Sequence, residues 1–244
     1  MPVYFVTGSA RGIGLELVLQ LAAHPENVII AAVRRTSSEL FDIQRERSNV
    51  RTVHCDVSSE ASVASLSTAI PNTLGPSARI DVVVNNAAVI AGKETHGLSV
   101  TTETLNDNIK TNVLGPALVV AALEPFLAPN ALIVNVTSGI GSLTLVSNGT
   151  IPAHITGYSI SKCALNMLTV HQALALKGKA RVVCLDPGHV KTSMGGENAV
   201  VEVADSAKGI RTVMEKLKHD DEGVVDRENG RARYLNFMGD EVPW

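Results

Sequence analysis

Short apolar segments alternate along this chain with longer segments of helical periodicity. The short segments are rich in Val and Ile, and because their apolar character is nearly continuous, they predict strands that are covered on both faces. They span residues 3–8, 27–35, 49–57, 79–87, 131–138, 180–188 and, more weakly, 232–239. In the longer segments Leu, Ala, Val and Ile return every three or four positions, which predicts helices at 12–24, 60–70, 103–123 and 157–177.

This alternation predicts a single α/β domain over residues 1–244, with a doubly wound parallel sheet of about seven strands. The length suits one such domain, and no linker, repeat or low-complexity tract divides the chain. Segments 139–156 and 191–206 are irregular and follow predicted strands. Ligands bind at the carboxyl edge of a parallel sheet, so these segments are candidate walls of a substrate site. Surface loops without such a role are the alternative.

Composition and charge narrow the class of protein. The net charge of -3 and the lack of a basic stripe argue against a nucleic-acid surface. Cys55, Cys163 and Cys184 have no CxxC spacing, which favours buried thiols in a reducing compartment. No apolar run approaches the ~18 residues of a membrane helix, and the first residues do not read as a secretory signal. We therefore expect a cytoplasmic protein with no membrane partner, and the scattered histidines predict no metal site.

Three glycines follow the first predicted strand in the sequence TGSARGIG, at Gly8, Gly12 and Gly14. Glycine permits positive φ, and without a side chain it lets a phosphate approach the N–H groups of a helix N-terminus. Three residues separate the first two glycines, so the spacing differs from G-x-G-x-x-G. Taken alone, the motif fits a dinucleotide-binding turn and a purely structural turn equally well.

The residues about 20 positions beyond this turn bear on which dinucleotide would bind. A carboxylate there binds the ribose 2′-hydroxyl, whereas an arginine binds a 2′-phosphate. This chain has Arg34 and Arg35, and no acidic residue lies between Ala31 and Ser38. Arg11 in the glycine turn could reach the same phosphate through charge-assisted hydrogen bonds. The pattern favours NADP(H) over NAD(H), with solvated charges at a strand end as the alternative.

Tyr158 and Lys162 are four residues apart on a predicted helix and therefore share one face. A nearby ammonium favours phenolate, so it is expected to lower the phenol pKa from about 10 towards a range useful for general acid–base chemistry. By itself such a pair is more often an ordinary helix surface. Ser138 ends a predicted strand, where its hydroxyl could polarise a carbonyl oxygen. Asn112 lies in a predicted helix beside a Gly-Pro pair, a costly place for a polar side chain that binds nothing.

Together these residues resemble the short-chain dehydrogenase/reductase family over nearly the whole chain. The motifs occur in the family's order: the glycine turn, the Asp56-Val57 pair, NNAA at 85–88, Asn112, Ser138, Tyr158 with Lys162, and PGHVKT at 187–192. The resemblance implies a Rossmann fold and NADP(H)-dependent hydride transfer between nicotinamide and a ketone, aldehyde or secondary alcohol. It is nearest to the carbonyl-reductase-like subgroup of insect and fungal ketoreductases.

The resemblance also implies residue roles. Tyr158 is then the proton donor, Lys162 lowers its pKa and holds the nicotinamide ribose, Ser138 orients the substrate carbonyl, and Asn112 supports a water-linked proton path. The implied cofactor contacts are Gly8, Ser9, Arg11, Gly12, Ile13, Gly14, Arg34, Asp56, Val57, Asn85, Ala87, Lys110, Tyr158, Lys162, Pro187, Val190 and Thr192.

Two departures from the family pattern and several alternatives stay open. Ala88 stands where the family has glycine, and the long interval before Tyr158 makes Ser142 a second candidate for the serine. The loops at 89–97, 139–156 and 191–206 suggest an apolar or aromatic carbonyl or alcohol as substrate. An NADP(H)-binding regulator without turnover, and an enzyme of non-redox cyclisation, isomerisation or dehydration, are the alternative functions. Homo-oligomers are compatible with the sequence.

Overall fold

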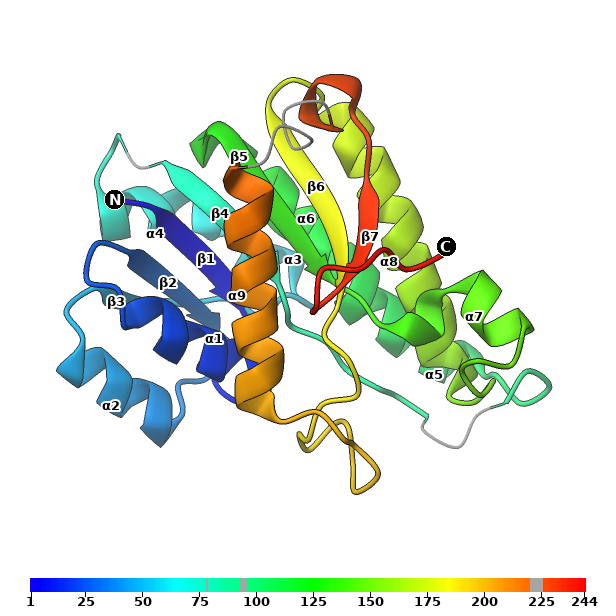
Figure 1. Cartoon of the computed structure of the whole chain (residues 1–244). Helices are drawn as coiled ribbons and strands as arrows, with labels where there is room; N and C mark the ends of the chain where they lie inside the picture. Colours follow the sequence, from blue (N-terminus) through cyan, green and yellow to red (C-terminus); the bar gives the residue numbers. More distant parts are fainter. Residues whose placement is uncertain (78, 93–95, 220–225) are drawn as a thin grey trace.

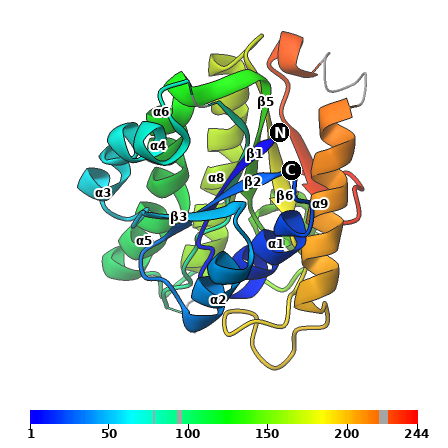
Figure 2. The ribbon, with the colours of Figure 1, turned by 90° about the vertical axis from the view of Figure 1, so that its left-hand side faces the viewer.

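The computed structural model describes residues 1–77, 79–92, 96–219 and 226–244. In these residues a seven-stranded sheet has the order β3-β2-β1-β4-β5-β6-β7, and all neighbouring strands are parallel. Helices cover both of its faces (Figures 1 and 2), which confirms the predicted doubly wound α/β fold. The strands are β1 (Val3–Thr7), β2 (Val28–Val33), β3 (Val50–His54), β4 (Ile80–Asn85), β5 (Leu127–Val136), β6 (Ala180–Asp186) and β7 (Arg233–Asn236).

The helices between these strands range from one short turn to the long α8. They are α1 (Gly12–Ala22), α2 (Ser38–Glu46), α3 (Glu60–Ala64), α4 (Leu66–Leu74), α5 (Thr102–Ile109), α6 (Gly115–Leu123), α7 (Leu143–Ser147), α8 (Thr156–Ala175) and α9 (Val203–His219). A π-helical turn, η1 (Lys110–Leu114), joins α5 to α6, and 3-10 turns form η2 (Glu124–Phe126) and η3 (Gly139–Gly141).

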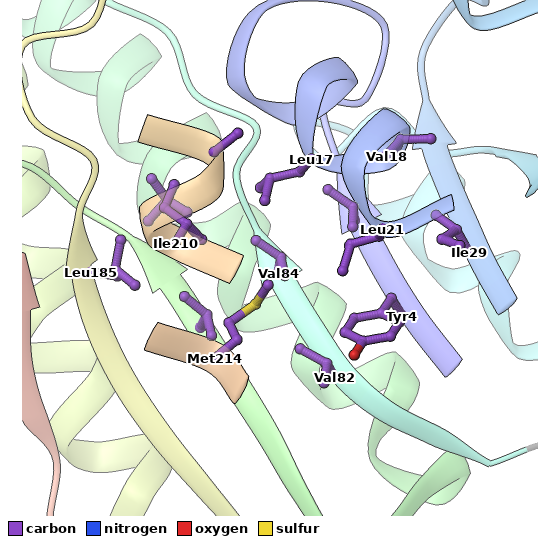
Figure 3. Packing of buried hydrophobic residues seen from close by; sticks show 14 of the residues in the cluster. Tyr4, Leu17, Val18, Leu21, Ile29, Val82, Val84, Leu185, Ile210 and Met214 are labelled. Atoms are coloured by element: carbon purple, nitrogen blue, oxygen red, sulfur yellow. The ribbon is translucent and has the colours of Figure 1, made fainter. Parts of the chain in front are cut away.

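One face of the sheet is covered by α1 and α9, with α2 at its edge (Figure 2). Leu17 and Leu21 of α1 and Met214 of α9 point towards the sheet, where Val84 lies between them (Figure 3). These side chains are almost completely buried, and full burial of one such side chain stabilises the fold by about 1.5–3 kcal/mol. The packing fixes α1, and with it the glycine turn at the start of that helix, against the sheet.

The opposite face packs against α3, α4 and α6. Phe5 and Val83 of the sheet are fully buried there against Ile70 of α4 and Val119 and Leu123 of α6. Because β2 and β3 lie on one side of β1 and β4 on the other, the helices that follow β1 and β4 leave towards opposite faces. A cleft for a ligand is expected where they separate, at the carboxyl edge of the sheet.

Two of the predicted helices are interrupted. The segment 60–70 divides into α3 and α4, and the segment 103–123 widens into the π-helical turn η1 directly before Pro116. Proline has no N–H, and its ring would collide with the carbonyl four residues earlier, that of Asn112. A wider turn at this point accommodates the ring without ending the helix.

Helices α2 and α9 are absent from the sequence prediction. The segment 191–206, expected to be irregular, ends inside α9, and the segment 139–156 contains η3 and α7. Both helices are amphipathic, so their apolar positions do recur at helical spacing, and the sequence prediction overlooked this signal. Leu40 is the buried residue of α2. In α9 Gly209 is a poor helix former, but a Cβ there would collide with the main chain at Phe237.

Candidate active site

The glycine turn joins β1 to α1 at the carboxyl edge of the sheet. Gly8 and Gly12 have φ of +69° and +55°, a region that side chains disfavour. A Cβ on Gly14 would lie 2.5 Å from both the carbonyl oxygen of Gly8 and Nδ2 of Asn86. The N-cap residue, Arg11, makes no side-chain cap, so the N–H groups of the first helical turn are available to an anion.

A cleft of about 1140 Å³ lies along this edge of the sheet. The structure brings most of the predicted cofactor contacts together around it, from β1, α1, β2, β4, α8 and the segments after β3 and β6. Those that line it are Gly8, Arg11, Gly12, Ile13, Arg34, Asp56, Val57, Ala87, Tyr158, Lys162, Pro187 and Thr192.

The other predicted contacts do not line the cleft, and their part in cofactor binding stays a prediction. Ser9 is buried, and its hydroxyl donates to a β1 carbonyl at 2.7 Å. Asn85 is directed into the core between β4 and β5, Val190 is buried, and Gly14 packs inside the glycine turn. Lys110 is exposed and borders a separate hollow beside α6.

Residues adjacent in sequence to three of these do line the cleft: Asn86 next to Asn85, Thr111 next to Lys110, and Lys191 next to Val190. Neighbouring side chains on a strand or helix point in different directions, so one member of each pair faces the cleft and the other does not.

Three arginines line one end of the cleft: Arg11, Arg34 and Arg35. All three are exposed, and together they form a positively charged rim. Glu39 and Asp42 of α2 line the same end. The sequence prediction missed these carboxylates because it did not include α2. An anion bound at this end of the cleft would therefore have both arginines and carboxylates near it. The arginines come from the glycine turn and the end of β2, and the carboxylates come from α2.

The Asp56-Val57 pair lies at the end of β3. The Asp56 carboxylate accepts from Ser58 Oγ at 2.7 Å and from its N–H at 3.0 Å. The side-chain bond from Ser58 is the main cause that lowers the pKa of Asp56, and the guanidinium of Arg34 contributes. Asp56 is therefore ionised at neutral pH and held in place by its own loop.

Tyr158 and Lys162 are both directed from α8 to the inner part of the cleft. Tyr158 is 8% exposed and Lys162 is 2% exposed. Lys162 Nζ donates to the carbonyl oxygen of Val136 at 2.8 Å and lies 5.5 Å from the centroid of the Tyr158 ring. The side chain of Ser138 lies beside the Tyr158 hydroxyl and acts to lower the pKa of the phenol, although Ser138 itself does not line the cleft. Three of the predicted catalytic side chains therefore form one group.

The expectation that Lys162 lowers the pKa of Tyr158 is wrong for this structure. Burial raises the pKa of the phenol, the Asp186 carboxylate raises it further, and the Ser138 hydrogen bond offsets only part of the effect. The ammonium donates to the Val136 carbonyl instead of to the phenol oxygen. Burial also lowers the pKa of Lys162, to about 8. The phenol is therefore protonated at neutral pH.

The two candidate serines occupy different environments. Ser142 is the N-cap of α7: its hydroxyl accepts from the N–H of Leu145 at 3.1 Å and donates to the carbonyl oxygen of Pro243 at 2.5 Å. It is 1% exposed, whereas Ser138 is partly exposed and lies beside the Tyr158 hydroxyl. The geometry therefore favours Ser138 as the group beside the phenol.

Asn112 is fully buried in η1 and contacts the loop after β4. Its Oδ1 accepts from the N–H of Val89, and its Nδ2 donates to the Val89 carbonyl, both at 2.9 Å. Nδ2 also donates to Oγ of Ser161 at 3.0 Å. The side chain binds protein backbone, and it does not line the cleft.

Asp186 is a site residue that the sequence prediction missed. It ends β6, and its Oδ1 accepts from the N–H of Gly188 at 3.0 Å. A second hydrogen bond comes from the N–H of Gly139, and burial raises the pKa of the carboxyl group. The signal in the sequence is a carboxylate at a strand end directly before Pro187.

Residues 1–77, 79–92, 96–219 and 226–244 contain no group of three or more His, Cys, Asp or Glu side chains that could hold a metal ion. Within the same ranges, none of the helices has the length and apolar character needed to cross a bilayer.

Comparison with known protein families agrees with the glycine turn and the Tyr158–Lys162 pair described above. Residues 2–202 match the family model of short chain dehydrogenases, so the chain belongs to this family of oxidoreductases. A relative is an uncharacterised oxidoreductase of Schizosaccharomyces pombe, 28% identical over 256 residues that cover 99% of this chain and 98% of the relative.

Solved structures of similar proteins cover the whole chain. One is the NADPH-bound carbonyl reductase from chicken fatty liver, with a TM-score of 0.83, 28% identity and complete coverage of both chains. Another is the carbonyl reductase Sniffer of D. melanogaster, with a TM-score of 0.85, 27% identity, and coverage of 100% of this chain and 99% of that one. The chain is thus similar to carbonyl reductases within its family.

Proposed function

We propose that this protein reduces a ketone or aldehyde with NADPH, and catalyses the reverse oxidation of the alcohol, with Tyr158 as the general acid and base. The observation that carries this proposal is the buried pair of Tyr158 and Lys162 at the inner part of the cleft, with Lys162 Nζ 5.5 Å from the centroid of the Tyr158 ring. Similarity to an NADPH-bound carbonyl reductase supports it.

The cleft fits a dinucleotide phosphate. The close approach at Gly8 and Gly14 leaves no room for side chains, and the first turn of α1 offers free N–H groups to a pyrophosphate. Arg34 and Arg11 would hold the 2′-phosphate through charge-assisted hydrogen bonds. When bound, the nicotinamide supplies or accepts the hydride.

The side chains of α8 and β5 supply and hold the proton. The raised pKa keeps the Tyr158 phenol protonated, so it can donate to the carbonyl oxygen of a substrate during reduction. Ser138, which lies beside Tyr158, would donate a second hydrogen bond to that oxygen and stabilise its developing charge. Lys162, with a pKa near 8, can give and take a proton near neutral pH while Val136 holds its ammonium.

The substrate is proposed to be a small apolar or aromatic carbonyl compound. Apolar side chains support this choice: Leu143 is 70% exposed at the start of α7, and Met194 lines the cleft after β6. The segments 139–156 and 191–206 that carry them form the proposed substrate walls; residues 93–95 of the segment 89–97 lie outside the described residues.

The test is the consumption of NADPH, followed by its absorbance, with a panel of ketones and aldehydes. Tyr158→Phe should lower turnover by at least about 100-fold, because it removes the proton donor, while NADPH affinity stays within about twofold. Tyr4→Phe is the matched control: it removes a hydroxyl from another buried tyrosine, on β1. Unchanged turnover in Tyr158→Phe would contradict the proposed role.

The same experiment separates the alternative functions. A regulator would bind NADPH without consuming it in the presence of any carbonyl compound. A non-redox enzyme would form the same product at the same rate whether or not NADPH is added, and it would leave the NADPH unoxidised. Product analysis with and without NADPH detects this. Either result would refute the proposed hydride transfer.

A further inference from the structure

The residues after β7 turn back and reach the loop that follows β5. This returning segment (residues 240–244) runs antiparallel to β7, and the N–H of Val242 donates to the carbonyl oxygen of Tyr234 at 2.8 Å. Its end lies beside α7 (Figure 1). Residues about 100 positions apart in sequence are thereby brought together.

Main-chain oxygens of the returning segment bind the first turn of α7. The hydroxyl of Ser142 donates to Pro243 at 2.5 Å. The main-chain oxygen of Trp244 accepts from Thr144 twice, from Oγ1 at 2.7 Å and from the N–H at 3.1 Å. The segment is thus attached to the loop that begins at Ser138.

Tyr234 connects this attachment to the site itself. Its ring is 2% exposed and packs against the Trp244 ring, with centroids 5.4 Å apart and planes tilted by 48°. Its hydroxyl donates to the carbonyl oxygen of Ser138 at 2.7 Å. The Tyr234 side chain therefore binds the backbone of Ser138, the residue whose own side chain lies beside Tyr158.

The peptide group between Ser138 and Gly139 is held at both ends. Its carbonyl accepts from Tyr234 and, at 2.8 Å, from the N–H of Gly141; its N–H donates to the Asp186 carboxylate. The fit is close, because a Cβ on Gly139 would lie 3.1 Å from Oδ2 of Asp186.

Helix α8 holds two further carbonyl groups of the loop. Ser159 Oγ donates to the carbonyl oxygen of Ile140 at 2.7 Å, and Asn166 Nδ2 donates to that of Gly141 at 3.2 Å. These contacts place the loop relative to the helix that carries Tyr158. The orientation of the Ser138 peptide itself depends on β6 and β7, through Asp186 and Tyr234.

We propose that Tyr234 and Trp244 are positioning residues that orient Ser138 towards Tyr158 and the substrate carbonyl. The hydroxyl of Tyr234 fixes the Ser138 carbonyl, and the ring of Trp244 holds the ring of Tyr234 in place. Neither residue touches the reacting atoms, so both act through Ser138. This role rests on the proposed carbonyl reduction.

The first test is Tyr234→Phe, which keeps the ring against Trp244 and removes the hydrogen bond to Ser138. We expect kcat to fall about three- to tenfold, the effect of losing one hydrogen bond, because the Ser138 carbonyl keeps its bond from Gly141. The dissociation constant for NADPH should stay within about twofold, because the loop does not form the phosphate site. Tyr4→Phe is again the matched control.

The second test uses Trp244, the one tryptophan of the chain. Trp244→Ala should lower kcat about threefold or more, and Trp244→Phe, which retains an aromatic ring, should restore most of it. In Tyr234→Phe the fluorescence of Trp244 and its quenching by acrylamide should match wild type, which shows that the returning segment is still attached. If Tyr234→Phe does not fold, the Trp244 pair decides the matter.

A kcat for Tyr234→Phe within twofold of the wild-type value would overturn the proposal. So would a parallel loss of kcat, NADPH affinity and thermal stability, because that pattern indicates general damage to the fold.

Hydrogen exchange separates this proposal from the proposed function. Amides of residues 139–147 should exchange faster in Tyr234→Phe and Trp244→Ala than in wild type, whether or not a carbonyl compound is reduced. If wild type reduces nothing, the proposed function fails, and the exchange rates then decide whether Tyr234 holds the Ser138 peptide. Unchanged exchange would overturn that claim.

Discussion

Asn112 provides a quantitative test of how the site loop is held. Asn112→Ala removes a fully buried side chain that makes two hydrogen bonds to the backbone of Val89 and one to Ser161. Each bond contributes about 0.5–1.5 kcal/mol net, so the loss of three predicts a decrease of about 2–4 kcal/mol in the free energy of unfolding. A domain of this size loses roughly 2–4 °C per kcal/mol, which corresponds to a decrease in Tm of about 5–15 °C.

The assay is urea denaturation followed by far-UV circular dichroism, with the m value fitted for each variant. Asn106→Ala is the matched control, because Asn106 lies on the adjacent helix α5 and is exposed; it should change stability by less than about 0.5 kcal/mol. A loss below about 0.5 kcal/mol in Asn112→Ala, at an unchanged m value, would refute the assignment of Asn112 as the anchor of Val89.

Two further predictions concern the cofactor and pH. Arg34→Asp should erode the preference for NADPH over NADH, because it places a carboxylate where the 2′-phosphate is proposed to bind; equal ratios of the two dissociation constants in variant and wild type would contradict this. Burial raises the pKa of the Cys184 thiol to about 12, from 9.0 in the unfolded chain. As the pH rises, the thiol of the unfolded chain ionises before the thiol of the folded protein, which favours the unfolded chain. The stability that the neutral thiol gives the folded protein is therefore complete below pH 9 and is lost as the pH rises towards 12. When the pH is raised from about 9 to 10.5, the free energy of unfolding should decrease in wild type by about 1–2 kcal/mol more than in Cys184→Ala, which has no thiol to ionise. If the free energy of unfolding depends on pH in the same way in both proteins, this thiol does not titrate as described.

The sequence alone determined the fold class and pointed to residues that the structure places at the cleft. Valine- and isoleucine-rich segments separated by helical periodicity are sufficient for a parallel α/β sheet, because strands buried on both faces need continuous apolar character. The glycine turn and the Tyr158–Lys162 pair were also predictable. Their geometry is set by spacing within one turn or one helix, and the structure places both at the cleft.

The tertiary structure decided what depends on residues far apart in the chain. Burial and the Asp186 carboxylate raise the pKa of Tyr158. The carbonyl of Pro243, 101 positions away, accepts the hydrogen bond that the Ser142 hydroxyl donates. Tyr234 reaches Ser138 across 96 positions of sequence. Spacing within a segment encodes neither desolvation nor such contacts, because both arise only when distant segments pack together.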